Sequence, residues 1–187
     1  AAVNALTAWL TLAGLFGYAV VYTVFLKRAT PQNIVIGGVA GALPPVLGWT
    51  AMTGSVGAEA LLLMMIIFTW TPPHFWALAI HRVEDYRRAG LPMLPVTHGE
   101  QFMTRAIVLY SWLLLAVSLL PAALGLAGWC YLLAALGLGA RFVCLAQSMH
   151  RGYSPSVSRA VFVYSIRYLS GIFAALLFDH YVFWPLA

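Results

Sequence analysis

The sequence predicts an all-α fold, a bundle of helices that crosses a membrane several times. Of its 187 residues, 63% are hydrophobic and 8% are charged, and the mean hydropathy is +0.89. Soluble domains average about 25% charged residues, and a domain of this size has too much surface to hide so many apolar side chains. The composition therefore excludes a water-soluble enzyme, a nucleic-acid-binding protein and a disordered chain.

Six predominantly apolar stretches have the length of about 20 residues that a membrane-spanning helix needs. Lys27 and Arg28 follow the first, a glycine-containing turn around residues 54–57 separates the second from the third, and Pro121 with neighbouring glycines separates the fourth from the fifth. The alternation typical of a membrane barrel is absent. The predicted spans run approximately over Val3–Phe25, Asn33–Thr53, Ala58–Ile80, Thr104–Ala123, Leu126–Met149 and Ala160–His180.

The basic residues alternate between connections in a way that predicts an orientation. They follow the first span, flank the long predicted loop Arg82–Gln101, and lie near the turn between the fifth and sixth spans, whereas the opposite connections carry none. Because basic loops stay on the cytoplasmic side, we expect this side to be cytoplasmic in a multi-pass membrane protein. We also expect no disulfide, because Cys130 and Cys144 would lie roughly 21 Å apart on one helix.

The densest polar stretch, residues 70–96, supplies the candidate metal ligands. If it is one continuous helix, His74, His81 and Asp85 share a face. Asp85 and Glu84 form a candidate Mg²⁺ site, since Mg²⁺ binds one or two carboxylates plus phosphate oxygens. The alternative is a solvated carboxylate at a helix end, paired with an arginine such as Arg82 or Arg88.

His74 would lie inside the bilayer, where an ionisable side chain is rare and usually functional. The alternative is an interhelical hydrogen bond beside the proline pair Pro72-Pro73. His81 lies closer to the interface, and for this residue a functional role and a structural role are about equally supported.

The basic residues are the candidates for binding a polyphosphate at the interface. Orientation alone would also account for most of them. These residues are Lys27, Arg28, Arg82, Arg87 and Arg88.

Three interior features complete the candidates. A small-residue face at residues 37–42 favours helix packing over ligand contact. Arg141 and Arg167 either extend to the interface or face a cavity. Several aromatic residues belong either to an apolar chamber or to the interface belt; they are Tyr18, Tyr22, Trp70, Phe75, Trp76 and Tyr86.

Three stretches together resemble one family. They read Tyr22-Thr-x-x-Leu-Lys-Arg-x-Thr-Pro-x-Asn33, Gly38-x-Ala-Gly-Ala-x-Pro-Pro-x-x-Gly-Trp49, and Trp70-Thr-Pro-Pro-His-Phe-Trp-Ala-Leu-Ala-Ile80 continuing into Asp85-Tyr-x-x-Ala-Gly-x-Pro-Met-Leu-Pro-Val96. A weaker similarity continues through Phe162-x-Tyr-Ser-Ile-x-Tyr-Leu169. The chain resembles the protoheme IX farnesyltransferase family of UbiA-like intramembrane aromatic prenyltransferases over essentially its whole length.

The resemblance implies a bundle of nine helices, of which this chain would supply six as one membrane domain, residues 1–187, the C-terminal part of the bundle. It implies transfer of farnesyl from farnesyl diphosphate to a vinyl group of haem b, with addition of water, giving haem o and diphosphate. Haem b is then a substrate, Mg²⁺ the cofactor, and a haem a-forming enzyme a partner. The chemistry needs no protein nucleophile, and the sequence shows no nucleophile–base arrangement.

The resemblance also assigns residue roles. Asp85, Lys27 and Arg28 would be catalytic, and Asp85 with Glu84 would hold Mg²⁺. The residues expected to bind substrate are His74, His81, Arg82, Tyr22, Asn33 and Arg88. Two departures matter: the family's first Asp-rich motif is absent, and its second, D-x-x-x-D, falls on His81-x-x-x-Asp85, so one carboxylate remains.

Two alternatives stay open. One is a related prenyltransferase for a quinone precursor or chlorophyllide; the other is a haem-binding carrier, which should show broken helices in matching halves. The chain starts without a methionine or the basic segment of a signal peptide. We therefore expect a fragment or processed chain. Because Glu84 and Asp85 are its only carboxylates near the diphosphate end, we expect it to be inactive alone and to regain farnesyl transfer when an upstream segment is supplied.

Overall fold

The computed structural model describes residues 3–90 and 92–183, without the side chains of Arg28 and Phe183. All regular elements in these residues are helices, which confirms the all-α prediction. The elements are α1 (Ala5–Phe16), η1 (Gly17–Leu26), α2 (Lys27–Ala29), α3 (Asn33–Gly41), α4 (Pro44–Thr53), α5 (Ala58–Ala79), η2 (Ile80–Arg82), α6 (Val83–Arg88), α7 (Leu94–Ala123), α8 (Trp129–Arg151) and α9 (Pro155–Phe183).

Six helical stretches are long and apolar enough to cross a membrane, as the sequence predicts. Asn33–Thr53 matches its predicted bounds, although a break at Ala42 and Leu43 divides it into α3 and α4. The helices α7 and α9 begin earlier than predicted, at Leu94 and Pro155. Hydropathy marks the part of a helix that lies in lipid, and these helices extend beyond it.

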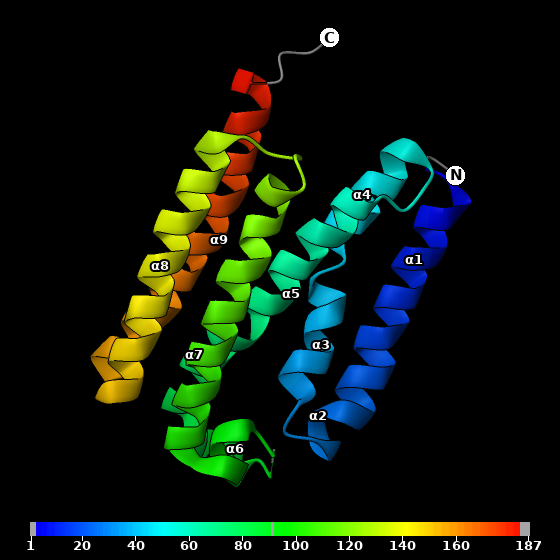
Figure 1. Ribbon diagram of the computed structural model, residues 1–187. Coiled ribbons are helices and arrows are strands. Elements are labelled where there is room, and N and C mark those ends of the chain that lie inside the picture. The colour runs from blue at the N-terminus through cyan, green and yellow to red at the C-terminus, as the bar shows by residue number, and fades with distance from the viewer. Residues whose placement is uncertain (1–2, 91, 184–187) are drawn as a thin grey trace.

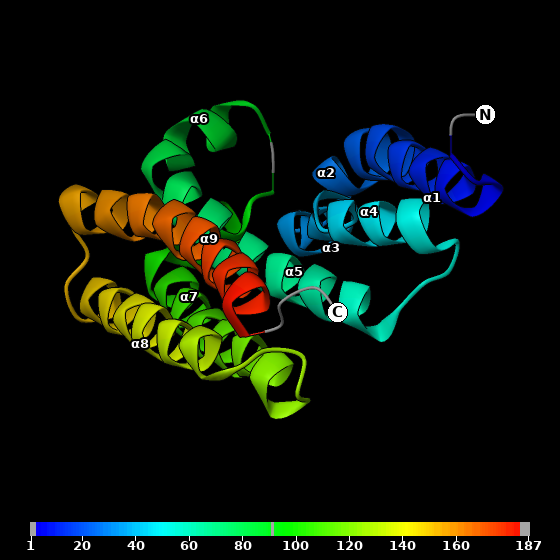
Figure 2. The ribbon, with the colours of Figure 1, turned by 90° about the horizontal axis from the view of Figure 1, so that it is seen from above.

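The connections between neighbouring spans are short, and successive spans run in opposite directions (Figure 1). Helix α5 lies between two groups, α1–α4 on one side and α7–α9 on the other (Figure 2). The start of α1 and the end of α9 lie at one end of the bundle, and α2 and α6 lie at the other (Figure 1). This confirms that six spans place both ends of the described chain on the same side.

The group formed by α5 and α7–α9 contains the main core. Trp76, Tyr131 and Tyr168 are fully buried there. The Tyr131 hydroxyl donates to the Ser118 carbonyl oxygen at 2.8 Å, and the Ser118 and Tyr168 hydroxyls are 2.7 Å apart. Such bonds satisfy polar groups that lipid cannot solvate. The α1 helix has no buried residue and attaches to α4 through polar contacts of Asn4 and Thr7 with Thr50.

The segment predicted as the loop Arg82–Gln101 is largely helical, so that prediction is wrong. It contains α6 and about the first two turns of α7, which begins at Leu94. The backbone of Gly99 has φ 80° and ψ 173°, a conformation that interrupts α7 and that residues other than glycine rarely adopt. Charged residues made this segment look like a loop, but they only exclude it from the hydrocarbon.

The second half of the first span is a π-helix, η1, which the sequence did not reveal. Its wider turn is closed by the Lys27 N–H, which donates to the Tyr22 carbonyl oxygen. Segments of this kind are rare and occur frequently at functional sites. In this chain η1 carries Tyr18 and Tyr22 and ends where Lys27 begins.

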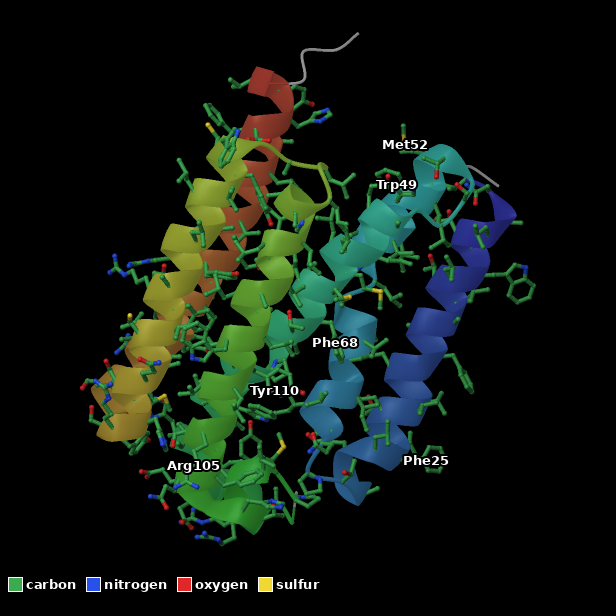
Figure 3. The ribbon with its side chains drawn as sticks, in the orientation of Figure 1. Phe25, Trp49, Met52, Phe68, Arg105 and Tyr110 are labelled. Carbon is green, nitrogen blue, oxygen red and sulfur yellow. The ribbon has the colours of Figure 1, made fainter. Side chains whose placement is uncertain are left out.

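Charged residues divide between the two ends of the bundle. Arg105 lies at the end formed by α2, α6 and the α8–α9 turn, and Trp49 and Met52 lie at the opposite end (Figure 3). Helices α2 and α6, the end of α8 and the start of α9 contribute the other basic residues of the first end, which we call the basic end. Both cysteines are unpaired, as predicted.

Asp179 is a buried carboxylate at the end opposite the basic end, and it caps α8 from another helix. Its oxygens accept hydrogen bonds from the N–H groups of Gly128 at 2.5 Å and Tyr131 at 3.1 Å. The first N–H groups of a helix have no partner within the helix, and a negative charge beside them is favourable.

We expect Asp179→Ala to lower the free energy of unfolding by about 2–3 kcal/mol, because it removes two charge-assisted hydrogen bonds and leaves their donors buried. Asp179→Asn, which keeps one carbonyl acceptor, should lose less. Denaturant unfolding in detergent micelles measures both. An alanine variant as stable as the parent protein would show that this cap contributes nothing.

Candidate active site

A first cavity of about 660 Å³ lies between η1, α3 and α5. Four of the aromatic residues proposed for an apolar chamber line it, namely Tyr18, Tyr22, Trp70 and Phe75, and the rings of Tyr18 and Tyr22 stack at 5.3 Å. Trp76 does not line it, because that side chain is buried against Tyr110.

The small residues of α3 both pack and line this first cavity. A Cβ atom on Gly37 would come within 2.5 Å of the Tyr22 ring, and one on Gly38 within 3.0 Å of Thr71. A side chain at Gly37 would therefore force the Tyr22 ring of η1 to move, and one at Gly38 would force Thr71 of α5 to shift by a few tenths of an ångström. The predicted helix packing is confirmed, and the same glycines leave room for a ligand beside them.

A second cavity, of about 560 Å³, lies between α4, α5 and α9. His74 lines it together with apolar residues of α9. Pro44, Ile67 and Trp70 line both the first and the second cavity. Trp70 therefore stands between two neighbouring apolar cavities within the helix bundle.

His74 is buried and held by three neighbours. Its ring stacks on Trp70 at 4.2 Å and on Phe162 at 4.8 Å between ring centroids. Its Nδ1 atom lies 2.6 Å from Ser165 Oγ on α9. The interhelical hydrogen bond that was the structural interpretation of His74 is thus present, and the residue also lines a cavity.

The predicted common face of His74, His81 and Asp85 is wrong, because the helix is not continuous. The 3₁₀ turn η2 follows Ala79, and Arg82 has φ −114° and ψ 23°, outside the helical region. His81 is exposed and lines a third cavity of about 550 Å³ at the basic end, with Arg159 and Phe162. It is separated from His74 and does not share its cavity.

The two carboxylates of α6 are exposed at the basic end. Glu84 forms an ion pair with Arg87, rather than with the expected arginines Arg82 or Arg88. Asp85 has no ion pair among the described residues. No three side chains of His, Cys, Asp or Glu gather as a metal site in the described part of the chain. A Mg²⁺ ion that binds one or two carboxylates and substrate phosphates needs no such cluster. The carboxylates of Glu84 and Asp85 therefore fit a Mg²⁺ ion bound in this way.

The predicted phosphate-binding residues lie around the same end. Lys27 is half-buried at the start of α2, and its carbonyl oxygen accepts a hydrogen bond of 3.2 Å from Asn33 Nδ2. Asn33 is fully buried, and its Oδ1 atom has no hydrogen-bond partner among the described residues. Arg82 and Arg88 are exposed, and the Arg28 side chain lies outside the described residues.

Arg141 and Arg167 do not line any of the cavities described here. Both are exposed, and the Arg141 guanidinium lies 5.2 Å from the centre of the Tyr164 ring. Their exposure supports the interpretation that they extend to the interface rather than face a cavity. A conduction path through these two residues has no support in the cavities.

Sequence comparison identifies the family. The profile of the UbiA prenyltransferase family matches residues 1–177. The chain belongs to the UbiA prenyltransferase family. Membership in the UbiA-like family, which the motifs indicate, is thereby confirmed.

Curated relatives match nearly all of the chain. Protoheme IX farnesyltransferase of Marinobacter nauticus is 63% identical over 183 residues, covering 98% of this chain and 61% of that protein. Protoheme IX farnesyltransferase 1 of Pseudomonas fluorescens is 64% identical over 179 residues, 96% of this chain and 60% of that protein. The chain thus spans about three fifths of the length of these relatives. No solved structure matches it.

Two neighbours of His74, Ser165 and Phe162, were not predicted from the sequence as parts of the site. Ser165 binds the His74 ring, and its carbonyl oxygen accepts a hydrogen bond of 2.7 Å from Trp70 Nε1. Phe162 covers the other face of that ring. Both lie in the weaker family-like stretch at residues 162–169, which was the available signal.

Proposed function

We propose that this protein transfers the farnesyl group of farnesyl diphosphate to a vinyl group of haem b, with addition of water, and releases haem o and diphosphate. The observation that carries the proposal is the identity of 62–64% to relatives named protoheme IX farnesyltransferase, over almost the whole chain. Two adjoining apolar cavities suit two large apolar substrates, one for each cavity.

The farnesyl chain is assigned to the first cavity, with its diphosphate at the basic end. Tyr22 lines this cavity and lies just before Lys27, whose ammonium group attracts phosphate oxygens. Asp85 and Glu84 on α6 would hold Mg²⁺ at the same end, and bound Mg²⁺ would neutralise charge on the leaving diphosphate. Arg28, Arg82 and Arg88 supply further positive charge to this end.

The rings around the first cavity stabilise positive charge on the farnesyl carbon as the diphosphate leaves. Aromatic faces attract cations, and Tyr18, Tyr22 and Trp70 line this largely apolar cavity. The haem vinyl carbon then attacks the allylic carbon. A water molecule supplies the hydroxyl group, and its proton is released.

Haem b is assigned to the second cavity, against His74. His81 lies outside that cavity and is retained only as a contact for a charged part of a substrate at the basic end. Since haem o is the precursor that a haem a-forming enzyme consumes, such an enzyme is the proposed partner.

The proposed activity is tested by supplying haem b and farnesyl diphosphate to membranes that contain the full-length protein. Formation of haem o, identified by its mass and its retention on reversed-phase chromatography, supports the assignment. If a quinone precursor or chlorophyllide is farnesylated and haem b is left unchanged, the proposed acceptor is wrong and the proposed prenyl transfer is right.

The proposed orientation places the basic end in the cytoplasm of a bacterial cell whose inner membrane holds the protein. After Cys130 and Cys144 are replaced, we expect cysteines introduced at positions 88 and 153 to react with an impermeant reagent from the cytoplasmic side. Those at 56 and 125 should react from outside, because they lie in the connections without basic residues. Cytoplasmic labelling of position 56 would reverse the orientation.

A further inference from the structure

The Ser165 side chain lies between two partners, and their chemistry decides where its proton is. Ser165 Oγ is 2.6 Å from the Phe162 carbonyl oxygen and 2.6 Å from His74 Nδ1. A carbonyl oxygen only accepts hydrogen bonds. The single hydroxyl hydrogen of Ser165 therefore points to Phe162, and the hydroxyl oxygen remains as an acceptor for His74.

This arrangement selects one tautomer of the His74 ring. Because Nδ1 must donate to Ser165 Oγ, the neutral ring carries its hydrogen on Nδ1 and a lone pair on Nε2. The Nε2 atom has no hydrogen-bond partner among the described residues, and His74 lines the second cavity. The ring cannot easily turn, because Trp70 and Phe162 stack on its two faces.

Ser165 also fixes the ring that packs on His74. Its carbonyl oxygen accepts the hydrogen bond from Trp70 Nε1 at 2.7 Å, so one residue of α9 holds two neighbouring side chains of α5. The same Trp70 separates the first cavity from the second. Through Ser165, helix α9 thus fixes the positions of the Trp70 and His74 side chains of α5 beside the two cavities.

We propose that Ser165 is a positioning residue that holds His74 in the Nδ1–H tautomer, so that Nε2 offers its lone pair to the iron of a haem in the second cavity. This inference rests on the proposed function and extends it to the binding mode of the acceptor. Histidines that ligate metals nearly always donate their other ring N–H to a hydrogen-bond acceptor, and loss of such a partner typically weakens metal binding about 10- to 100-fold.

The test is a titration of the full-length protein in detergent with ferric haem b, followed by its Soret absorption. Ser165→Ala should weaken binding by about 10- to 100-fold. In the reduced complex the iron–histidine stretching band in the resonance Raman spectrum should move to lower frequency, because Nδ1–H no longer donates. Ser165→Thr, which keeps the hydroxyl group, should restore the band position.

Ser111→Ala is the matched control. Ser111 is a buried serine on α7 whose hydroxyl bonds only to the Ile107 carbonyl oxygen, at 2.7 Å, among the described residues. It should leave the haem affinity and the Raman band unchanged. Thermal unfolding of each variant separates loss of the fold from loss of the ligand.

Each result decides between the proposals. If Ser165→Ala matches Ser111→Ala in affinity and band position while the wild-type protein shows histidine-ligated haem, the positioning role is wrong and the proposed function stands. If the wild-type protein binds haem b without a histidine-ligand spectrum, His74 ligation is wrong. If the wild-type protein does not bind haem b but farnesylates another acceptor, the proposed acceptor is wrong.

Discussion

Asp85→Asn in the full-length protein is expected to lower the turnover of farnesyl transfer by about 10²-fold or more, the effect typical of losing one electrostatic stabiliser of a transition state. Asp85 is exposed on α6 at the basic end and has no ion pair among the described residues, whereas Glu84 is paired with Arg87. It is therefore the free carboxylate of this helix for a diphosphate-bound Mg²⁺. Turnover is measured as haem o formed at saturating concentrations of both substrates.

Glu100→Gln is the control for this change. Glu100 is an exposed carboxylate of α7 that is near the same end and lines none of the cavities described here. It should retain the wild-type turnover, and haem b binding should be unaffected in both variants. Activity of Asp85→Asn within about twofold of wild type would remove Asp85 from the site.

His74→Phe is expected to affect the other substrate. Phenylalanine keeps a ring between Trp70 and Phe162 but removes both the hydrogen bond to Ser165 and the lone pair that faces the second cavity. We expect the affinity for haem b to fall by about 10²-fold, a little under 3 kcal/mol. The KM for farnesyl diphosphate should change little, because His74 does not line the first cavity.

The matched control is His98→Phe. His98 is also a histidine that stacks on a phenylalanine, Phe102, at 4.8 Å, and bonds to a hydroxyl group, that of Thr97, at 2.7 Å, but it is exposed on α7. Replacing it should change neither haem affinity nor turnover. Equal effects of the two substitutions, or unchanged haem affinity in His74→Phe, would contradict the assignment of His74.

Several parts of the site were predictable because they depend on neighbouring residues in the chain. The charged pair Lys27-Arg28 after an apolar span, and the carboxylates Glu84 and Asp85 after another, had to lie at one membrane face. The structure places α2 and α6 at the same end (Figure 1). Their joint binding of Mg²⁺ and diphosphate remains a prediction.

Other parts were not predictable, because helix periodicity assumes an unbroken helix. The turn η2 changes the direction of the chain after Ala79, so the four-residue spacing of His81 and Asp85 no longer continues the face of His74. The π-helix η1 likewise leaves no composition signal, since its residues are as apolar as those of α1.

The sequence by itself determined the class of fold, the number of spans, the basic end and the family, because hydropathy, charge and motifs are properties of adjacent residues. Only the tertiary structure decided what surrounds His74. Ser165 lies 91 positions away along the chain and reaches His74 because α9 packs on α5. The cavities on the two sides of Trp70 arise in the same way, from gaps between helices that no local pattern records. Hydrogen bonds and packing join side chains across space, so the tautomer and the surroundings of this histidine follow from helix packing.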